Sequence, residues 1–96
     1  MRLTAVRENL PSMYSIVIKN SAKKEIDAIP NVQFLKIDTA ILSLKTKPHP
    51  YPQSKKLKGE NNRRLRIGDY RVFYAVDEKE KTITIYRVRH RKEVYR

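Results

Sequence analysis

The sequence predicts an α+β fold in which a helical hairpin covers one face of a small, mainly antiparallel sheet. Residues 13–19 alternate apolar and polar side chains, as a strand with one buried face does. Residues 21–29 and 31–44 space their apolar side chains at helical intervals, and residues 62–88 return to alternation in three short runs. The expected order is therefore β-α-α-β-β-β.

The first helix is expected to follow Asn20 and Ser21, whose side chains can accept hydrogen bonds from its first free amides. Pro30 should end this helix because proline lacks an amide hydrogen and clashes with the preceding turn. The apolar stripe of this helix consists of Ala22, Ile26 and Ile29.

A second helix is expected to begin at Asn31, a further N-cap residue, and to end near Lys45 and Lys47, where the helix dipole favours cations. The apolar stripe of this helix consists of Phe34, Ile37, Ile41 and Leu44, widened by Leu35 and Leu42. The proline-rich run 48–52 predicts a stiff connector, and residues 54–60 predict a basic loop.

Short turns should make the runs 62–67, 70–77 and 82–88 antiparallel neighbours, and strand 13–19 should join the same sheet. Arg64 and Arg66 alternate with apolar residues along the first of these runs. We expect one face of the sheet to meet the helices and the other to stay open and collect the arginines.

The chain is one domain of 96 residues with a formal net charge of +12 and a pI near 10.2. This excess predicts a polyanionic or acidic partner, with nucleic acid first, an anionic membrane second and an acidic protein third. The chain has no apolar run of spanning length and no basic amphipathic helix, so we expect no membrane partner. A merely basic protein is the alternative.

The chain has no cysteine, which excludes disulfides and thiolate chemistry and agrees with a reducing cytoplasm. His49 and His90 are far apart in the sequence, and the carboxylates are scattered, so we expect no metal or other cofactor. Residues 1–12 lack the apolar stretch of a signal peptide and are interpreted as an upstream extension or an expression remnant. A short basic arm packed on the domain is the alternative, and 13–96 is the expected domain.

Arginines gather on or at the ends of strands that should be adjacent, and their forked guanidinium groups can bind two phosphate oxygens at once. The set is Arg64, Arg66, Arg71, Arg87, Arg89, Arg91 and Lys92. Such a site could stabilise a developing phosphorane, or the strand faces could simply hold nucleic acid. Tyr95 could stack on a base or hold a reacting oxygen, with an edge aromatic folded onto the sheet as the alternative. His90 could carry a proton or be a plain strand-end residue.

Three runs together resemble the RelE/ParE toxin superfamily, on its RelE side: Leu57-Lys58-Gly59, residues 64–74 from Arg-Leu-Arg-Ile-Gly-Asp-Tyr to Arg-Val-Phe-Tyr, and His90-Arg91-Lys92-Glu93-Val94-Tyr95. The resemblance covers residues 13–96 and implies a RelE-like fold. It also implies a toxin of a toxin–antitoxin pair that enters the ribosomal A site and cuts messenger RNA there without a metal. The 2′-hydroxyl attacks the adjacent phosphate, leaving a cyclic phosphate and a free 5′-hydroxyl.

The resemblance carries the family's catalytic roles onto five positions: Arg64, Arg71, His90, Arg91 and Tyr95. A lysine is common where Arg64 stands, and a lysine found in some members falls at Asn62, so Arg63 is its expected substitute. The residues expected to bind nucleic acid are Lys55, Lys56, Lys58, Arg63, Arg66, Arg89, Lys92 and Arg96. Because the chain ends right after Tyr95, the C-terminal helix of some members is expected to be absent.

The implied partners are a ribosome with its messenger RNA and an acidic antitoxin that folds across the toxin. An enzyme without a strong base should be slow until the ribosome orients its substrate. A ParE-like inhibitor of DNA gyrase, which is no enzyme, is the first alternative. A catalytically silent nucleic-acid binder is the second.

Overall fold

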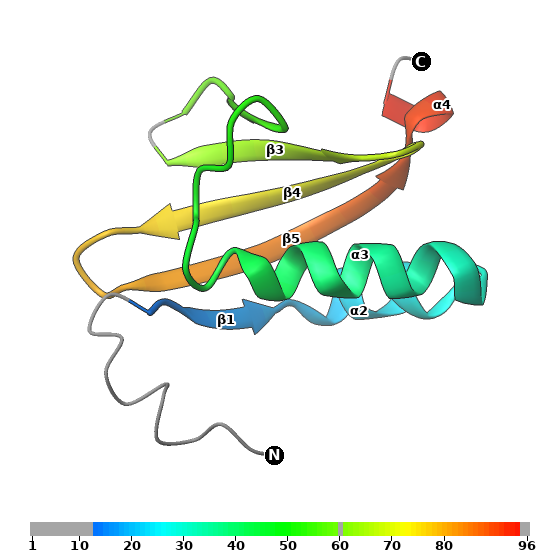
Figure 1. Ribbon diagram of the computed structural model, residues 1–96, viewed down its shortest axis with the longest axis horizontal. Helices are drawn as coiled ribbons and strands as arrows, with labels where there is room; N and C mark the ends of the chain where they lie inside the picture. Colours follow the sequence, from blue (N-terminus) through cyan, green and yellow to red (C-terminus); the bar gives the residue numbers. More distant parts are fainter. Residues whose placement is uncertain (1–12, 60, 95–96) are drawn as a thin grey trace.

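The sheet runs through the whole molecule, and two helices lie together on one side of it (Figure 1). This computed structural model describes residues 13–59 and 61–94. Within them the strands are β1 (Ser15–Ile18), β2 (Ser54–Lys56), β3 (Asn62–Ile67), β4 (Tyr70–Asp77) and β5 (Thr82–His90). The helices are α2 (Asn20–Asp27), α3 (Asn31–Ser43) and α4 (Arg91–Val94). The predicted α+β class and the helical hairpin are confirmed.

The strand order β1-β5-β4-β3-β2 follows from the connections. Short turns link β3, β4 and β5, which pair as antiparallel neighbours. The helical hairpin carries the chain across the sheet after β1, so β1 lies parallel to β5 at one edge. Because β1 has only four residues, it pairs with Thr82–Ile85 and leaves the second half of β5 to another element.

The core lies between the helices and the sheet face that they cover, called here the inner face. Ile37 and Leu44 from the helical layer and Tyr74, Ile83 and Ile85 from the sheet are almost fully buried. The prediction that Leu35 and Leu42 widen the buried stripe of α3 is wrong, because they are 64% and 52% exposed. The repeat of Ile37, Ile41 and Leu44 fills the contact with the sheet, and residues beside it turn outward.

The predicted helix caps are also wrong. Asn20 and Asn31 are the first residues inside α2 and α3, and neither helix has a side-chain cap. The backbone carbonyls of Lys19 and Pro30 accept the first helical hydrogen bonds instead, from Lys23 and Phe34 at 2.9 Å each. Lys19 is fixed by its own amide, which donates to the Ile85 carbonyl of β5, so the turn into α2 is set by the sheet.

The structure of two segments differs from the prediction. The expected basic loop 54–60 begins with an edge strand, β2, whose Ser54 lies opposite Leu65 of β3 and is buried. After His90 the chain forms the short helix α4 at Arg91–Val94, an element that the sequence does not predict. The Arg91 amide donates to the Asp69 carbonyl in the β3–β4 turn at 2.6 Å, which draws the chain out of the strand direction.

The β4–β5 pair contains a bulge that changes which side chains face the core. Phe73 lies opposite Arg87 and Tyr74 opposite Ile85, so Tyr86 is an extra residue without a partner. Strict alternation from Ile85 would turn Arg87 toward the core and Val88 away from it. The bulge reverses this, since Val88 is buried and Arg87 is exposed.

A directed chain of hydrogen bonds joins the edge strand to the core. Arg63 Nε donates to Ser54 Oγ at 2.8 Å, and Ser54 Oγ lies 2.6 Å from the Tyr74 hydroxyl, which donates to the Pro48 carbonyl at 2.7 Å. Each polar group is satisfied by the next, and the chain holds the proline-rich connector against the sheet.

Replacing Tyr74 by Phe should lower the free energy of unfolding by about 1–2 kcal/mol, because Ser54 and Pro48 lose a buried partner. Burial raises the pKa of Tyr74, so the stability from its neutral phenol is complete below about pH 10 and is lost at higher pH. Denaturant titrations of wild type and Tyr74→Phe at neutral and alkaline pH measure both effects. The control variant Tyr51→Phe alters a residue that is 91% exposed, so it should change neither the free energy of unfolding nor its dependence on pH.

Candidate nucleic-acid interface

Cationic side chains gather on the sheet face that the helices leave uncovered, called here the open face. The register places Arg66 opposite Arg71, Arg71 opposite Arg89, and Arg64 opposite both Phe73 and Lys55. These residues come from four adjacent strands and point to the same side. The expected concentration of arginines is therefore present on one face.

Arg71 is the buried member of this set, with 7% of its surface exposed. One of its terminal nitrogens, Nη1, donates to the carbonyls of Gly68 and Tyr70 at 2.9 Å each. No carboxylate of the described residues forms an ion pair with it. A buried guanidinium that is held in place but not neutralised is a strong attractor for an anion.

A hollow of about 220 Å³, called here the arginine hollow, opens beside Arg71. Its lining residues are Pro52, Gln53, Lys55, Arg64, Arg66 and Arg71. None of them is acidic, so four cations face one space without a compensating charge. Positive fields of this kind concentrate anions such as phosphate.

A second, wider hollow of about 620 Å³, called here the aromatic groove, continues along the open face. Its lining residues are Arg64, Phe73, Arg87, Arg89, Glu93 and Val94. Arg64 lines both hollows, so they meet at its side chain. The single carboxylate of the groove, that of Glu93, already accepts a hydrogen bond from the His90 amide at 3.2 Å.

Glu25 of α2 fixes the end of β5 that β1 does not reach. One carboxylate oxygen accepts the Val88 amide at 2.7 Å, and the other lies 3.4 Å from a terminal nitrogen of Arg89. The helix therefore satisfies the free edge of the strand and anchors an arginine of the open face. Sequence reasoning missed this residue, since a lone glutamate on a helix carries no signal of such a contact.

His90 and Arg91 do not share the hollow of Arg64 and Arg71. His90 lies opposite Tyr70, and the two rings meet edge to face at 5.2 Å on the inner side of the sheet. Its Nδ1 accepts the Lys92 amide at 3.2 Å, so the neutral ring carries its proton on Nε2. Arg91 and Lys92 are exposed on α4.

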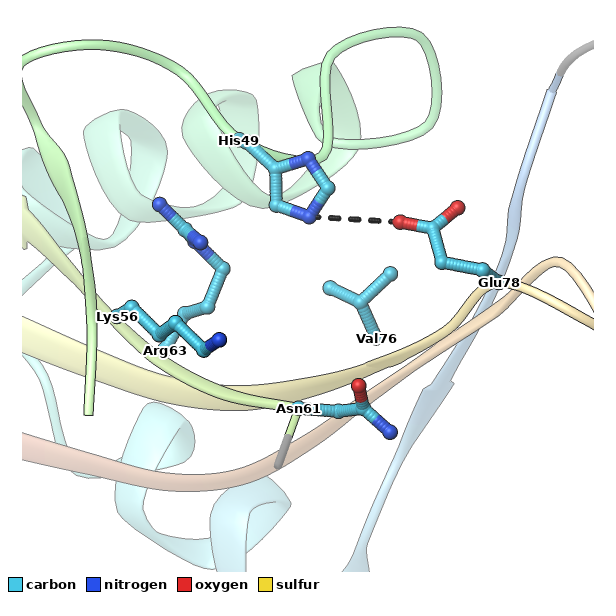
Figure 2. Close-up of a pocket in the computed structure, with 6 residues that line it drawn as sticks. All are labelled: His49, Lys56, Asn61, Arg63, Val76 and Glu78. Carbon is cyan, nitrogen blue, oxygen red and sulfur yellow. Dashed lines mark ion pairs between the residues drawn. The ribbon is translucent and has the colours of Figure 1, made fainter. Parts of the chain in front are cut away.

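The other residues predicted for this site do not all lie on the open face. Arg63 and Lys56 face the inner side and line a pocket of about 130 Å³ with His49, Asn61, Val76 and Glu78, where His49 and Glu78 form an ion pair (Figure 2). Lys58 is exposed after β2. Tyr95, Arg96 and residues 1–12 lie outside the described part of the chain.

Phe73 and Tyr86 form an aromatic pair on the open face, with ring centroids 6.4 Å apart. Burial raises the pKa of Tyr86, so its phenol stays protonated at neutral pH. The outward position of Phe73 follows from alternation, but no pattern in the sequence indicates the bulge that brings Tyr86 to it.

The described residues contain no group of three side chains that could hold a metal ion. No helix in the described part of the chain is long and apolar enough to cross a membrane.

Solved structures of toxins share this fold. The archaeal RelE–RelB complex from Pyrococcus horikoshii matches with a TM-score of 0.77 and 28% identity, covering 82% of this chain and 96% of that one. The RelB–RelE complex from Methanococcus jannaschii gives 0.68 and 26%, covering 82% and 94%. The isolated E. coli RelE toxin gives 0.70 at 20% identity, covering 85% and 90%. The fold is that of the RelE/ParE toxin superfamily.

A family model described as the ParE toxin of the type II toxin–antitoxin system parDE matches residues 16–95. A sequence comparison with curated proteins gave no significant match. The chain therefore belongs to this family and is a toxin of a type II toxin–antitoxin system.

Replacing Glu25 by Ala should lower the free energy of unfolding by about 1–3 kcal/mol, because the Val88 amide loses its acceptor. Amide hydrogen exchange at Val88 should accelerate, and Glu25→Gln should restore part of the protection. The matched control is Asp27→Ala, an exposed acid of the same helix. Equal exchange at Val88 in wild type and Glu25→Ala would contradict the assignment.

Proposed function

We propose that this toxin is a metal-independent endoribonuclease that cuts messenger RNA in the ribosomal A site. The observation that carries the proposal is the arginine hollow, where buried Arg71 meets Arg64 and Arg66 without a carboxylate in the lining. An inhibitor that works only by binding another protein does not need a buried, unneutralised guanidinium beside an open hollow.

The reaction is a transfer within the RNA backbone. The 2′-oxygen attacks the adjacent phosphorus, the bond from phosphorus to the 5′-oxygen breaks, and the products are a cyclic phosphate and a 5′-hydroxyl. Arg71 and Arg64 bind the non-bridging oxygens and stabilise the charge that develops on them. Since the carbonyls of Gly68 and Tyr70 already orient Arg71, it needs little rearrangement during the reaction.

Two protons have to move. The 2′-hydroxyl loses one to solvent, and the 5′-oxygen gains one. We propose His90 for the second transfer, because its Nδ1 is already an acceptor and its proton is on Nε2. His90 lies on the inner side of the sheet at the end of β5, so RNA bound in the arginine hollow has to pass this strand end to reach it. We also propose that Arg91 and Tyr95 hold the phosphate and a reacting oxygen, as the resemblance to the toxin superfamily implies. Without a strong base the enzyme should be slow until the ribosome positions the messenger.

The proposed partners follow from charge. Ribosomal RNA would contact Lys55, Lys56, Lys58 and the outer faces of the helices, with steep salt dependence. The structure from Pyrococcus horikoshii is a RelE–RelB complex and that from Methanococcus jannaschii an antitoxin–toxin complex, and we propose an acidic antitoxin for this chain, which carries a charge of +12. Both partners place the toxin in the cytoplasm.

A second candidate function is inhibition of DNA gyrase. The description of the matching family as the ParE toxin favours it. Under this proposal the chain is no enzyme, and the arginines of the open face bind DNA or an acidic surface.

A translating extract separates the two functions. With added toxin, we expect new messenger 5′ ends within ribosome-bound codons. Arg71→Lys keeps the charge and loses the fork, so cleavage should fall by about 100-fold or more. Lys79→Ala, in the β4–β5 turn, should cleave like wild type. Intact messenger together with gyrase-dependent DNA breaks would favour the second function.

Arg91→Ala and Tyr95→Phe should each relieve growth inhibition in cells that express the toxin, because each removes one proposed contact to the reacting groups. Growth curves on induction are the measurement, with thermal unfolding of each variant as a check on the fold. If both variants remain as toxic as wild type, the proposed roles of Arg91 and Tyr95 are wrong, and those of Arg64 and Arg71 are unaffected.

A further inference from the structure

Phe73 lines the aromatic groove, the ring of Tyr86 lies beside it, and the core uses neither ring. Phe73 and Tyr86 stand 6.4 Å apart at an interplanar angle of 45° on the open face, each half-buried. Neither ring belongs to the hydrophobic core or to the partly buried side chains packed against it. Aromatic rings on an uncovered sheet face are a common platform for nucleobases.

We propose that Phe73 and Tyr86 form a stacking site for a base of single-stranded RNA. This inference rests on the proposed function and adds to it, because it assigns a base-binding subsite next to the phosphate site. The subsite contacts the flat face of the base, so the expected ligand is an unpaired nucleotide rather than a duplex.

The position of the pair is a consequence of the bulge in β5. Tyr86 is the extra residue that has no partner on β4, and Phe73 lies opposite the next residue, Arg87. The bulge therefore brings a second ring beside Phe73 and turns Arg87 to the same face. Bulges occur often next to functional sites, where they redirect side chains.

Charge identifies the occupant. Phe73 shares the groove with Arg64, Arg87 and Arg89, and the one acid, Glu93, accepts the His90 amide. A ligand that fits this groove must combine a flat apolar surface and a negative charge in a single small group. A nucleotide of single-stranded RNA does so, with its base on the rings and its phosphates on the guanidinium groups.

Arg64 connects this subsite to the proposed cutting site, since it lines both hollows. An RNA strand that places a phosphate in the arginine hollow can extend its neighbouring nucleotide into the aromatic groove. The stacked base then belongs to a nucleotide that flanks the cut.

The test measures binding without a ribosome and without cleavage. The probe is a short single-stranded RNA with 2′-deoxy sugar at its centre to prevent cutting, and with 2-aminopurine beside it. We expect the fluorescence of 2-aminopurine to be quenched, and the affinity to exceed that of the same strand with an abasic site by about tenfold or more. Duplex RNA of the same sequence should not show this difference.

The variants separate stacking from charge. Phe73→Leu and Tyr86→Leu should each remove most of the preference for the base-containing strand, whereas Tyr86→Phe should keep it. Val17→Ala, a half-exposed apolar residue on the open face of β1, is the matched control and should bind like wild type. Unfolding curves verify that each variant is folded.

A wild-type protein that binds the abasic and base-containing strands equally would overturn the stacking site. So would Phe73→Leu and Tyr86→Leu variants that are folded and retain the full preference, or a duplex that binds as well as the single strand. The extract assay is independent of these outcomes, because messenger cleavage can succeed with no stacking preference. Conversely, stacking without cleavage would remove the proposed reaction and leave this subsite in place.

Discussion

The bulge in β5 is the constraint on which the open face depends. A strand alternates its side chains strictly, so arginines that follow Ile83 and Ile85 by even steps would enter the core, where an unpaired guanidinium is expensive. One extra residue, Tyr86, shifts the alternation by one position. Val88 then continues the core, and Arg87 and Arg89 turn to the side where Arg64, Arg66 and Arg71 already lie. The one extra residue in β5 therefore keeps the core apolar and also places these arginines on the open face.

Concentrating this much charge on one face has a structural cost, and the molecule offsets it locally. Arg71 is held by two backbone carbonyls, and Arg89 is paired with Glu25. Arg63, which points to the other side, donates to Ser54 within a chain of hydrogen bonds. Arg89 and Arg63 thus support the fold, whereas Arg71 is oriented but not neutralised and remains available to an anion with Arg64 and Arg66.

Much of the fold was predictable because the local spacing of apolar side chains determines most of its strands and helices. The strand at Ser15–Ile18, the two helices of the hairpin and the three-stranded antiparallel unit follow from alternation, helical spacing and short turns. What escaped prediction depends on contacts distant in sequence. Ser54 becomes part of a strand only because Leu65 lies opposite it, and α4 turns where Arg91 meets the Asp69 carbonyl. In the candidate site, the shared face of Arg64 and Arg71 follows from alternation, whereas the contact of Glu25 with Val88 and the pairing of Tyr86 with Phe73 required the folded arrangement.

Glu25 connects the helical layer to the open face of the sheet. Its carboxylate belongs to the helical layer, yet it holds an amide at the sheet margin and a guanidinium that reaches the opposite surface. Any ligand that moves α2 must release both together. A protein that binds the outside of the helices and shifts α2 would therefore free Arg89 and the Val88 amide without touching the open face.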